Sequence, residues 1–360
     1  MRIQIKIKAY LLKILTKKQK NNFNIKNAKS VLILRYDRIG DMVVTTPVFR
    51  ELKRAYPDIN ITVLASKENK DVILNNPYIF EVYTNYKNSL LSDLFTLIKL
   101  RNKHFDVCIE FDHSVIIHAI IRLKIINPKK IISIYKDGRY GVKGSELELY
   151  DFYTNKDTKN HFSKIWLDTL IFFGINSNST KYDFFLSDLE NEKSNLFISN
   201  INKKFKIGIN IEAFSLEKRL KLNELKDICE QLYAYCSDIK IILLSSPSFM
   251  KHQSEIISAM GLNFVTMSHK TPTIIDAAAL IKQLDLVISP DTSIVHIASA
   301  FNIPIISIHE SNKESYRLWA PQSELNSTIF AMSEVGLFDY NVDKVASSAI
   351  DFIKTIELEK

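Results

Sequence analysis

Glycine is scarce in this chain of 360 residues, which contains eight glycines in all and only Gly40 among its first 137 positions. A dinucleotide-binding fingerprint needs three glycines in the spacing G-x-G-x-x-G after the first strand. The isolated Gly40 therefore argues against a nucleotide-binding oxidoreductase or epimerase. Because glycine is favoured where the backbone needs unusual freedom, the few that occur are informative.

Cysteine pairs, metal-ligand clusters and long apolar runs are also missing. Cys108, Cys229 and Cys236 form no C-x-x-C pair, so we expect buried free thiols in a reducing compartment. No apolar run reaches the roughly 18 residues of a membrane-spanning helix. Glu110-Phe111-Asp112 resembles a paired-carboxylate metal motif, but no other ligand set accompanies it. We predict neither a metal nor a cofactor.

Acidic residues are absent before Asp37. Residues 1–29 instead hold nine basic side chains, and without these nine the net charge falls from +8 to −1. Apolar residues are interleaved with the basic ones, a pattern suited to the anionic inner face of a membrane. We expect either peripheral membrane contact of a cytoplasmic protein through this leader, or a solvated basic tail. No aromatic-rich basic motif supports nucleic-acid binding.

Strands and helices alternate along the rest of the chain, and its length allows two cores. The pattern predicts an α/β protein of two halves joined by a polar connection. The expected segments are a leader over 1–29, a first domain over 30–175, a linker over 176–204, a second domain over 205–345, and a C-terminal helix or tail over 346–360.

The stretch over residues 285–309 organises the second half. Its apolar run 286–288 predicts a buried strand, and the cap-rich residues after it predict a helix that starts near Asp291-Thr292-Ser293. We expect His296 on the non-core face of that helix, one turn inside from Thr292. The carboxyl end of a parallel strand followed by a helix N-terminus favours a phosphate ligand. A plain helix cap with a structural histidine is the alternative.

The first half opens with a strand over 30–35, followed by a polar loop that contains Gly40 and Asp41. Thr46-Pro47 predicts an N-cap with proline at the first helical position. Residues 136–144 concentrate three glycines and three basic residues, among them Arg139 and Lys143. This composition predicts either a mobile lid over an anionic ligand or an ordinary surface loop.

These motifs together resemble the heptosyltransferases of glycosyltransferase family 9. The segment Arg35-x-Asp37-Arg38-Ile39-Gly40-Asp41, followed by Thr45-Thr46-Pro47, is similar to the amino-terminal signature of the family. Pro290-Asp291-Thr292-Ser293-x2-His296 is similar to its D-T-G-x-x-H signature. Ser215-x2-Lys218-Arg219 and Trp319-Ala320-Pro321 match two further patterns in order. The resemblance runs from about residue 30 to about residue 325.

The resemblance implies a GT-B architecture, in which two Rossmann-like domains face each other across a cleft. It implies an inverting, metal-independent transfer of a sugar, with heptose from ADP-heptose as the expected donor and a lipopolysaccharide core or related lipid-linked glycan as the acceptor. Asp41 would be the general base. The expected donor-binding residues are Lys218, Ser215, Asp291, Thr292, Ser293 and His296, and the expected acceptor or lid residues are Arg38, Gly40, Arg139 and Lys143.

The chain departs from the family at some positions. Ser293 replaces a glycine, and Leu220-Lys221 replaces a Trp-Pro pair. Asp291 would either bind donor hydroxyls or cap its helix. Two alternatives stay open: a glycosyltransferase with another nucleotide-sugar donor, and a non-catalytic relative that binds nucleotide-sugars.

Overall fold

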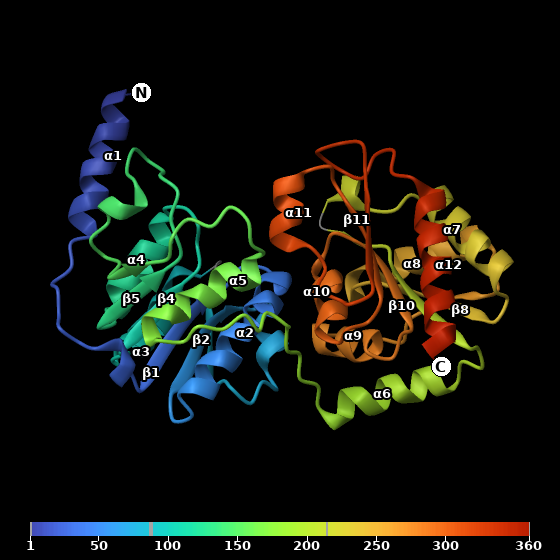
Figure 1. Ribbon diagram of the computed structural model, residues 1–360, viewed down its shortest axis with the longest axis horizontal. Helices are drawn as coiled ribbons and strands as arrows, with labels where there is room; N and C mark the ends of the chain where they lie inside the picture. Colours follow the sequence, from blue (N-terminus) through green and yellow to red (C-terminus); the bar gives the residue numbers. More distant parts are fainter. Residues whose placement is uncertain (1, 86–88, 214, 360) are drawn as a thin grey trace. The chain divides into compact units, whose positions relative to one another are not determined.

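The computed structural model describes residues 2–85, 89–213 and 215–359, which divide into two compact units, 1–180 and 181–360 (Figure 1). Each unit contains one six-stranded parallel sheet. The α/β fold expected from the sequence is confirmed. Cys108, Cys229 and Cys236 are free thiols, and the first two are buried.

Unit 1 is built on strands in the order β3-β2-β1-β4-β5-β6. Their bounds are β1 Ser30–Arg35, β2 Asn60–Ser66, β3 Glu81–Asn85, β4 Val107–Glu110, β5 Lys130–Ser133 and β6 Phe152–Tyr153. The helices are α1 Arg2–Leu15, α2 Ile39–Ala55, α3 Leu90–Arg101, α4 Ile117–Ile126 and α5 Phe162–Leu167. Leu32 and Leu34 of β1 share a buried cluster with α1, α3 and α4. Because side chains alternate along a strand, Val31 and Ile33 face the other side, where α2 packs on α5.

Unit 2 repeats the topology with the order β12-β11-β10-β7-β8-β9. Its strands are β7 Phe205–Asn210, β8 Ile239–Leu244, β9 Val265–Met267, β10 Leu286–Pro290, β11 Ile305–His309 and β12 Asn326–Phe330. Its helices are α6 Asp188–Ser199, α7 Leu222–Tyr235, α8 Met250–Met260, α9 Ile274–Ile281, α10 Ser293–Ala300, α11 Lys313–Trp319 and α12 Val342–Glu359. Helices α7, α8 and α12 bury their apolar residues against one face of the sheet.

The strand order reverses once in each sheet, between β1 and β4 in unit 1 and between β7 and β10 in unit 2. Such a reversal opens a crevice at the carboxyl ends of the two strands, because their following helices lie on opposite faces. In doubly wound folds, the ligand-binding residues gather at these carboxyl ends of the central strands.

The start of α2 differs from the sequence expectation. The helix begins at Ile39 rather than at Thr46-Pro47, so Gly40 and Asp41 lie in its first turn and not in a loop. Arg38 is the N-cap residue, and its backbone N–H donates to Asp41 Oδ2 at 3.2 Å. Pro47 lies inside the helix, where it lacks the N–H that Val43 O would accept. Thr46 Oγ1 supplies that hydrogen bond instead, at 2.7 Å from Val43 O.

The leader also differs from the solvated basic tail that the sequence left open. Its first part is helix α1, whose Leu12 belongs to the unit 1 core at 5% exposure, and Ile25 is 4% exposed. Helix α1 lies against the segment 136–144, where Gly141 adopts φ +79 and a Cβ on it would come within 2.6 Å of Ile5 (Figure 1). Residues 176–204 are likewise more than a polar connection, because α6 packs against α9.

Candidate functional site

In unit 1, Asp41 is held at the reversal of the sheet by a buried arginine. Arg35 ends β1 and is 3% exposed, and its Nη2 donates to Asp41 Oδ1 at 2.9 Å. Its Nε donates to the Asp41 backbone oxygen at 3.3 Å. The second carboxylate oxygen of Asp41 accepts the helix-capping bond from Arg38. The carboxylate is therefore fixed in orientation, while its side chain keeps 17% exposure to solvent.

Arg35 itself is positioned by an aromatic ring that the sequence reasoning did not single out. Its guanidinium carbon lies 3.8 Å from the centroid of Trp166 on α5 and 5.6 Å from that of Phe111. Arg35 Nη1 also donates to Asp37 Oδ2 at 3.1 Å. A planar guanidinium stacked on an indole loses little further freedom when it binds a carboxylate. Arg35 and Trp166 thus form a rigid support for Asp41.

The acids Glu110, at the end of β4, and Asp112 belong to a buried ion-pair network. Glu110 pairs with the fully buried Lys136 ammonium and accepts a hydrogen bond of 3.0 Å from Ser133 Oγ. Burial acts to raise the pKa of Glu110, but Lys136 and the bonds at Asp112 hold it below its ordinary value. Burial and the Glu110 charge raise the pKa of Asp112 to about 9. Asp112 is therefore a neutral acid at pH 7, next to an ionised glutamate. Among the described residues, no group of acids, histidines and cysteines is arranged to hold a metal ion.

The four expected acceptor or lid residues fall in two places. Arg38 and Gly40 precede Asp41 at the start of α2, with Arg38 exposed and Gly40 buried. Arg139 and Lys143 are exposed in the segment that lies against α1. Arg139 N–H donates to Val142 O at 3.0 Å, and Lys143 N–H donates to Glu146 at 2.6 Å. The segment is also held by the rest of unit 1, because the Asp137 N–H donates to His113 O at 2.7 Å and Lys136 pairs with Glu110. Its role as a lid stays a prediction.

In unit 2, a hydrogen-bonded group spans the reversal between β7 and β10. Asn210 Nδ2 lies 3.1 Å from both Ser289 Oγ and Thr292 Oγ1, and it also donates to Glu212 O at 3.0 Å. Thr292 is the N-cap of α10 and accepts the Ile294 N–H at 3.3 Å. The helix start expected near residues 291–293 is confirmed. Asn210 was missed, although a polar residue at the carboxyl end of a buried strand is a usable signal.

Lys218 is tied to the carboxyl end of β11 by an acid that the sequence reasoning missed. Its Nζ lies 2.7 Å from Glu310 Oε2, while Glu310 Oε1 accepts the Gly336 N–H at 2.6 Å. Burial raises the pKa of Glu310, but these two hydrogen bonds more than offset that effect and leave it below the ordinary value. Ser215 is the N-cap of the short 3-10 helix Leu216–Lys218, so it helps to shape the turn that carries the lysine.

The sequence placed His296 on the non-core face of its helix, but the structure buries this residue. Its side chain is buried at 4% exposure, and its ring lies 6.0 Å from Tyr182 and 5.7 Å from Trp319. The helical periodicity separates a core face of α10 from a non-core face. Helix α9 and the rings of Tyr182 and Trp319 pack around α10, so the non-core face is covered as well. Burial lowers the pKa of His296 to about 4, so the imidazole is neutral at pH 7. A contact between His296 and a donor stays a prediction.

His309 and Asp291 lie near each other at the same sheet edge. His309 Nδ1 is 3.9 Å from Asp291 Oδ2, and the imidazole is 3% exposed. Burial lowers the pKa of His309 although Asp291 acts to raise it. Asp291 keeps 27% side-chain exposure. A neutral imidazole beside a partly open carboxylate gives this edge hydrogen-bonding groups without adding positive charge.

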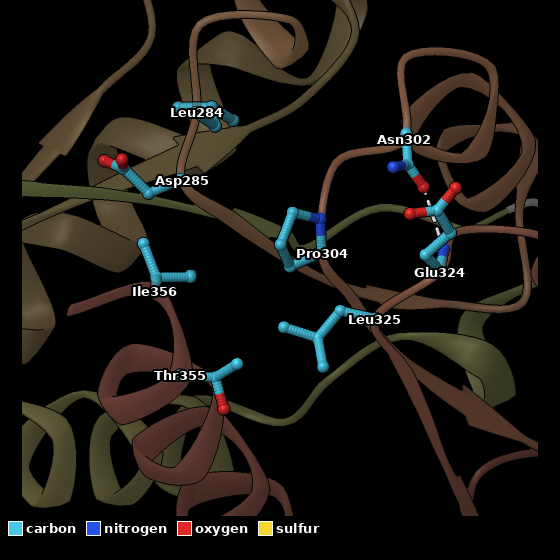
Figure 2. Close-up of a pocket in the computed structure, with 8 residues that line it drawn as sticks. All are labelled: Leu284, Asp285, Asn302, Pro304, Glu324, Leu325, Thr355 and Ile356. Atoms are coloured by element: carbon cyan, nitrogen blue, oxygen red, sulfur yellow. Dashed lines mark hydrogen bonds between the residues drawn. The ribbon is translucent and has the colours of Figure 1, made fainter. Parts of the chain in front are cut away.

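A pocket of about 450 Å³ in unit 2 lies at the amino ends of the sheet strands (Figure 2). Its lining includes Asp285, Pro304 and Leu325, which directly precede β10, β11 and β12. These are the amino ends of the strands, whereas Thr292 and Glu310 follow the carboxyl ends. Asn302 and Glu324 close one side through the hydrogen bond drawn in Figure 2. The pocket is therefore separate from the residues expected to bind a donor.

Comparison with protein families decides the class of the molecule. The model of glycosyltransferase family 9 (heptosyltransferase) matches residues 97–335, which is more than half of the chain. The chain belongs to glycosyltransferase family 9. The matched range includes the Lys218, Thr292 and Glu310 region of unit 2, while Asp41 precedes it.

Known proteins resemble this family 9 glycosyltransferase in sequence and, for solved structures, in fold. The lipopolysaccharide core heptosyltransferase OpsX of Haemophilus influenzae is 24% identical over 326 residues, covering 85% of each chain. A crystal structure of a family 9 glycosyl transferase from Veillonella parvula superposes with a TM-score of 0.75 at 17% identity, covering 94% of this chain and 100% of the other. The ADP-heptose lps heptosyltransferase II of E. coli gives a TM-score of 0.72 at 16% identity, with 91% and 99% covered. The two-domain α/β fold of the GT-B heptosyltransferases is therefore shared.

Proposed function

We propose that this enzyme of lipopolysaccharide biosynthesis transfers heptose from ADP-heptose to a lipopolysaccharide core or related lipid-linked glycan, with inversion and without a metal. The observation that carries the proposal is the carboxylate of Asp41, fixed by Arg35 and the α2 cap but still open to solvent. A base in this state can take the proton of an acceptor hydroxyl as that hydroxyl attacks the sugar. Direct attack opposite the leaving diphosphate inverts the anomeric centre.

Unit 2 supplies groups suited to the donor. The departing ADP carries negative charge, which a lysine ammonium and a helix N-terminus stabilise. Lys218 and the Thr292-capped start of α10 offer these two features at the carboxyl ends of their strands. Asp291, Ser215 and Ser293 are polar neighbours available to donor hydroxyls and phosphate. Ser293 does not have a positive φ, so a serine fits this position without backbone strain.

Replacement of Asp41 by asparagine tests the base. We expect Asp41→Asn to reduce transfer from ADP-heptose by roughly 10²–10⁴-fold, the usual size of the loss of a general base. Asp37→Asn is the matched control, because Asp37 bonds the same arginine but its side chain is 39% exposed. It should retain most of the activity. If Asp41→Asn kept wild-type turnover and Asp37→Asn were inactive, the general base would be Asp37 and not Asp41.

We further propose a cytoplasmic enzyme that contacts the inner membrane face through its basic leader. No helix in the described residues is long and apolar enough to cross a membrane. Because Leu12 and Ile25 are buried, a charge-neutralising variant is a cleaner test than deletion of the leader. Lys6→Gln/Lys8→Gln/Lys20→Gln should weaken binding to anionic vesicles, whereas Lys251→Gln/Lys270→Gln/Lys344→Gln in unit 2 should not. All six lysines are exposed. Equal binding by the two triple variants would contradict the contact.

A further inference from the structure

Helix α3 is apolar on its outward face as well as on its core face. Leu97 and Leu100 are buried in the unit 1 core at 3% and 0% exposure. Five further apolar residues of the same helix are exposed: Leu90 at 88%, Leu91 at 71%, Leu94 at 44%, Phe95 at 66% and Ile98 at 43%. At 100° per residue these five fall on one continuous stripe, roughly opposite the core side. A surface helix in water normally carries polar residues there, so this face has the composition of a surface that is covered.

The two neighbouring helices extend the same surface. Helices α1 and α4 pack on the same side of the sheet as α3, because Leu12, Ile120 and Leu97 share one buried cluster. Lys124 Nζ of α4 donates to Lys17 O just after α1, at 2.8 Å, and Arg101 of α3 donates to Ile125 O of α4, at 2.9 Å. Their outward faces expose Ile7, Tyr10, Leu11, Ile14 and Leu15 on α1, and Ile117 and Ile121 on α4.

The charges on these three helices are mostly positive, although Glu146 of the neighbouring segment pairs with Lys13 of α1 at 2.6 Å. The sequences of α1, α3 and α4 contain a single acid, Asp93, and it is paired with Arg122 at 2.9 Å and is 13% exposed. Among the described side chains, the same three helices contain seven basic residues: Lys6, Lys8, Lys13, Lys99, Arg101, Arg122 and Lys124. On α1, Lys6 and Lys8 are exposed on either side of the apolar stripe that contains Ile7 and Leu11. Apolar residues bordered by lysines match the two layers of a membrane surface, the acyl chains and the anionic headgroups.

We propose that the outward faces of α1, α3 and α4 form one membrane-docking surface for an anionic bilayer, with α3 inserted below the headgroups. This proposal extends the leader contact put forward above, which involved only residues 1–29. A second copy of the chain is a poorer occupant, because two such faces would bring like charges together. An anionic lipid surface instead complements the basic rim and accepts the apolar stripe.

Substitutions on α3 test the proposal in the full chain. The variant Leu91→Ser/Phe95→Ser/Ile98→Ser removes apolar area without touching the core. The matched control is Leu189→Ser/Leu196→Ser on α6 of unit 2, whose leucines are 58% and 67% exposed. Binding is measured by co-sedimentation with phosphatidylglycerol/phosphatidylethanolamine vesicles and with phosphatidylcholine vesicles. We expect the α3 variant to lose more than tenfold in partition to the anionic vesicles, the control to bind like the wild type, and all three proteins to bind phosphatidylcholine weakly.

Two outcomes would contradict the proposed membrane-docking surface. One is an α3 variant that binds anionic vesicles as tightly as the wild type. The other is a wild-type protein that forms dimers without lipid and becomes monomeric in the α3 variant, which would make this face an interface between copies. Thermal melting checks that the variants fold, and the single change Leu91→Ser repeats the comparison with less disturbance. Transfer to a soluble acceptor is measured separately, so that a failure of the transferase proposal is distinguishable from a failure of the docking surface.

Discussion

The ammonium of Lys218 lies 2.7 Å from the carboxylate of Glu310, which joins the turn after β7 to the carboxyl end of β11. Glu310 is anchored in turn by the backbone N–H of Gly336. The lysine is thus held at the carboxyl ends of the strands, where the capped start of α10 also lies. A cation that is already oriented loses less side-chain freedom when it binds an anionic ligand.

Removal of Lys218 should weaken donor binding. A charge-assisted hydrogen bond is worth about 1.5–3 kcal/mol, so Lys218→Ala should lower the affinity for ADP-heptose by roughly 10–150-fold. The donor-induced rise in melting temperature should shrink accordingly. Lys221→Ala is the control, since Lys221 pairs with Glu224 at 3.3 Å and is 55% exposed. If both alanine variants bind the donor like the wild type, Lys218 does not contact the diphosphate.

The buried imidazole of His296 should make unit 2 sensitive to acid. Its pKa is about 4 in the folded chain, below the ordinary 6.5 of an unfolded one. The unfolded chain therefore takes up the proton first, and stability falls as the pH drops from about 6.5 to 4. At about 1.4 kcal/mol per pKa unit this contribution is roughly 3 kcal/mol. Thermal melting should show a shallower acid slope for His296→Gln than for His252→Gln, whose histidine is 56% exposed. Equal slopes would contradict this prediction.

The acid pair Glu110 and Asp112 should respond oppositely to amide substitution. Glu110→Gln leaves the buried Lys136 ammonium without its partner and should cost about 3–5 kcal/mol of stability. Asp112 has a pKa of about 9, so it stays protonated when folded but ionises when unfolded above about pH 4. Its contribution to stability therefore declines as the pH rises from about 4 to 9. Asp112→Asn should flatten that decline, as measured by denaturant unfolding across this range. A destabilised Asp112→Asn variant at pH 8 would refute the protonated state.

The repeated β/α alternation and the strands that begin at residues 30 and 286 were predictable from the sequence, because buried parallel strands appear as apolar runs. The start of α2 was not, since Thr46-Pro47 is a good N-terminal signal and the true cap is an arginine. Only the tertiary structure shows that Thr46 replaces the hydrogen bond that Pro47 cannot make. Local pattern therefore gave the existence of the helix and not its first turn.

Long-range partners explain what else was missed at the candidate site. Asp41, Lys218 and Thr292 stood out because they sit in recognisable motifs. Arg35 was noted only as part of a signature, and its support, Trp166, lies 131 positions away in the chain. Glu310 meets Lys218 across 92 positions. Burial of His296 likewise depends on Tyr182 and Trp319, which periodicity within one helix cannot reveal.

The central claim is the transfer of heptose from ADP-heptose, and a donor panel tests it most directly. The purified full-length chain is incubated with a lipopolysaccharide core acceptor and with ADP-heptose, UDP-sugars or GDP-sugars, and glycosylated product is measured by mass spectrometry. We predict product from ADP-heptose at a rate that exceeds the other donors and depends on Asp41. Product from a UDP-sugar with none from ADP-heptose would contradict the account.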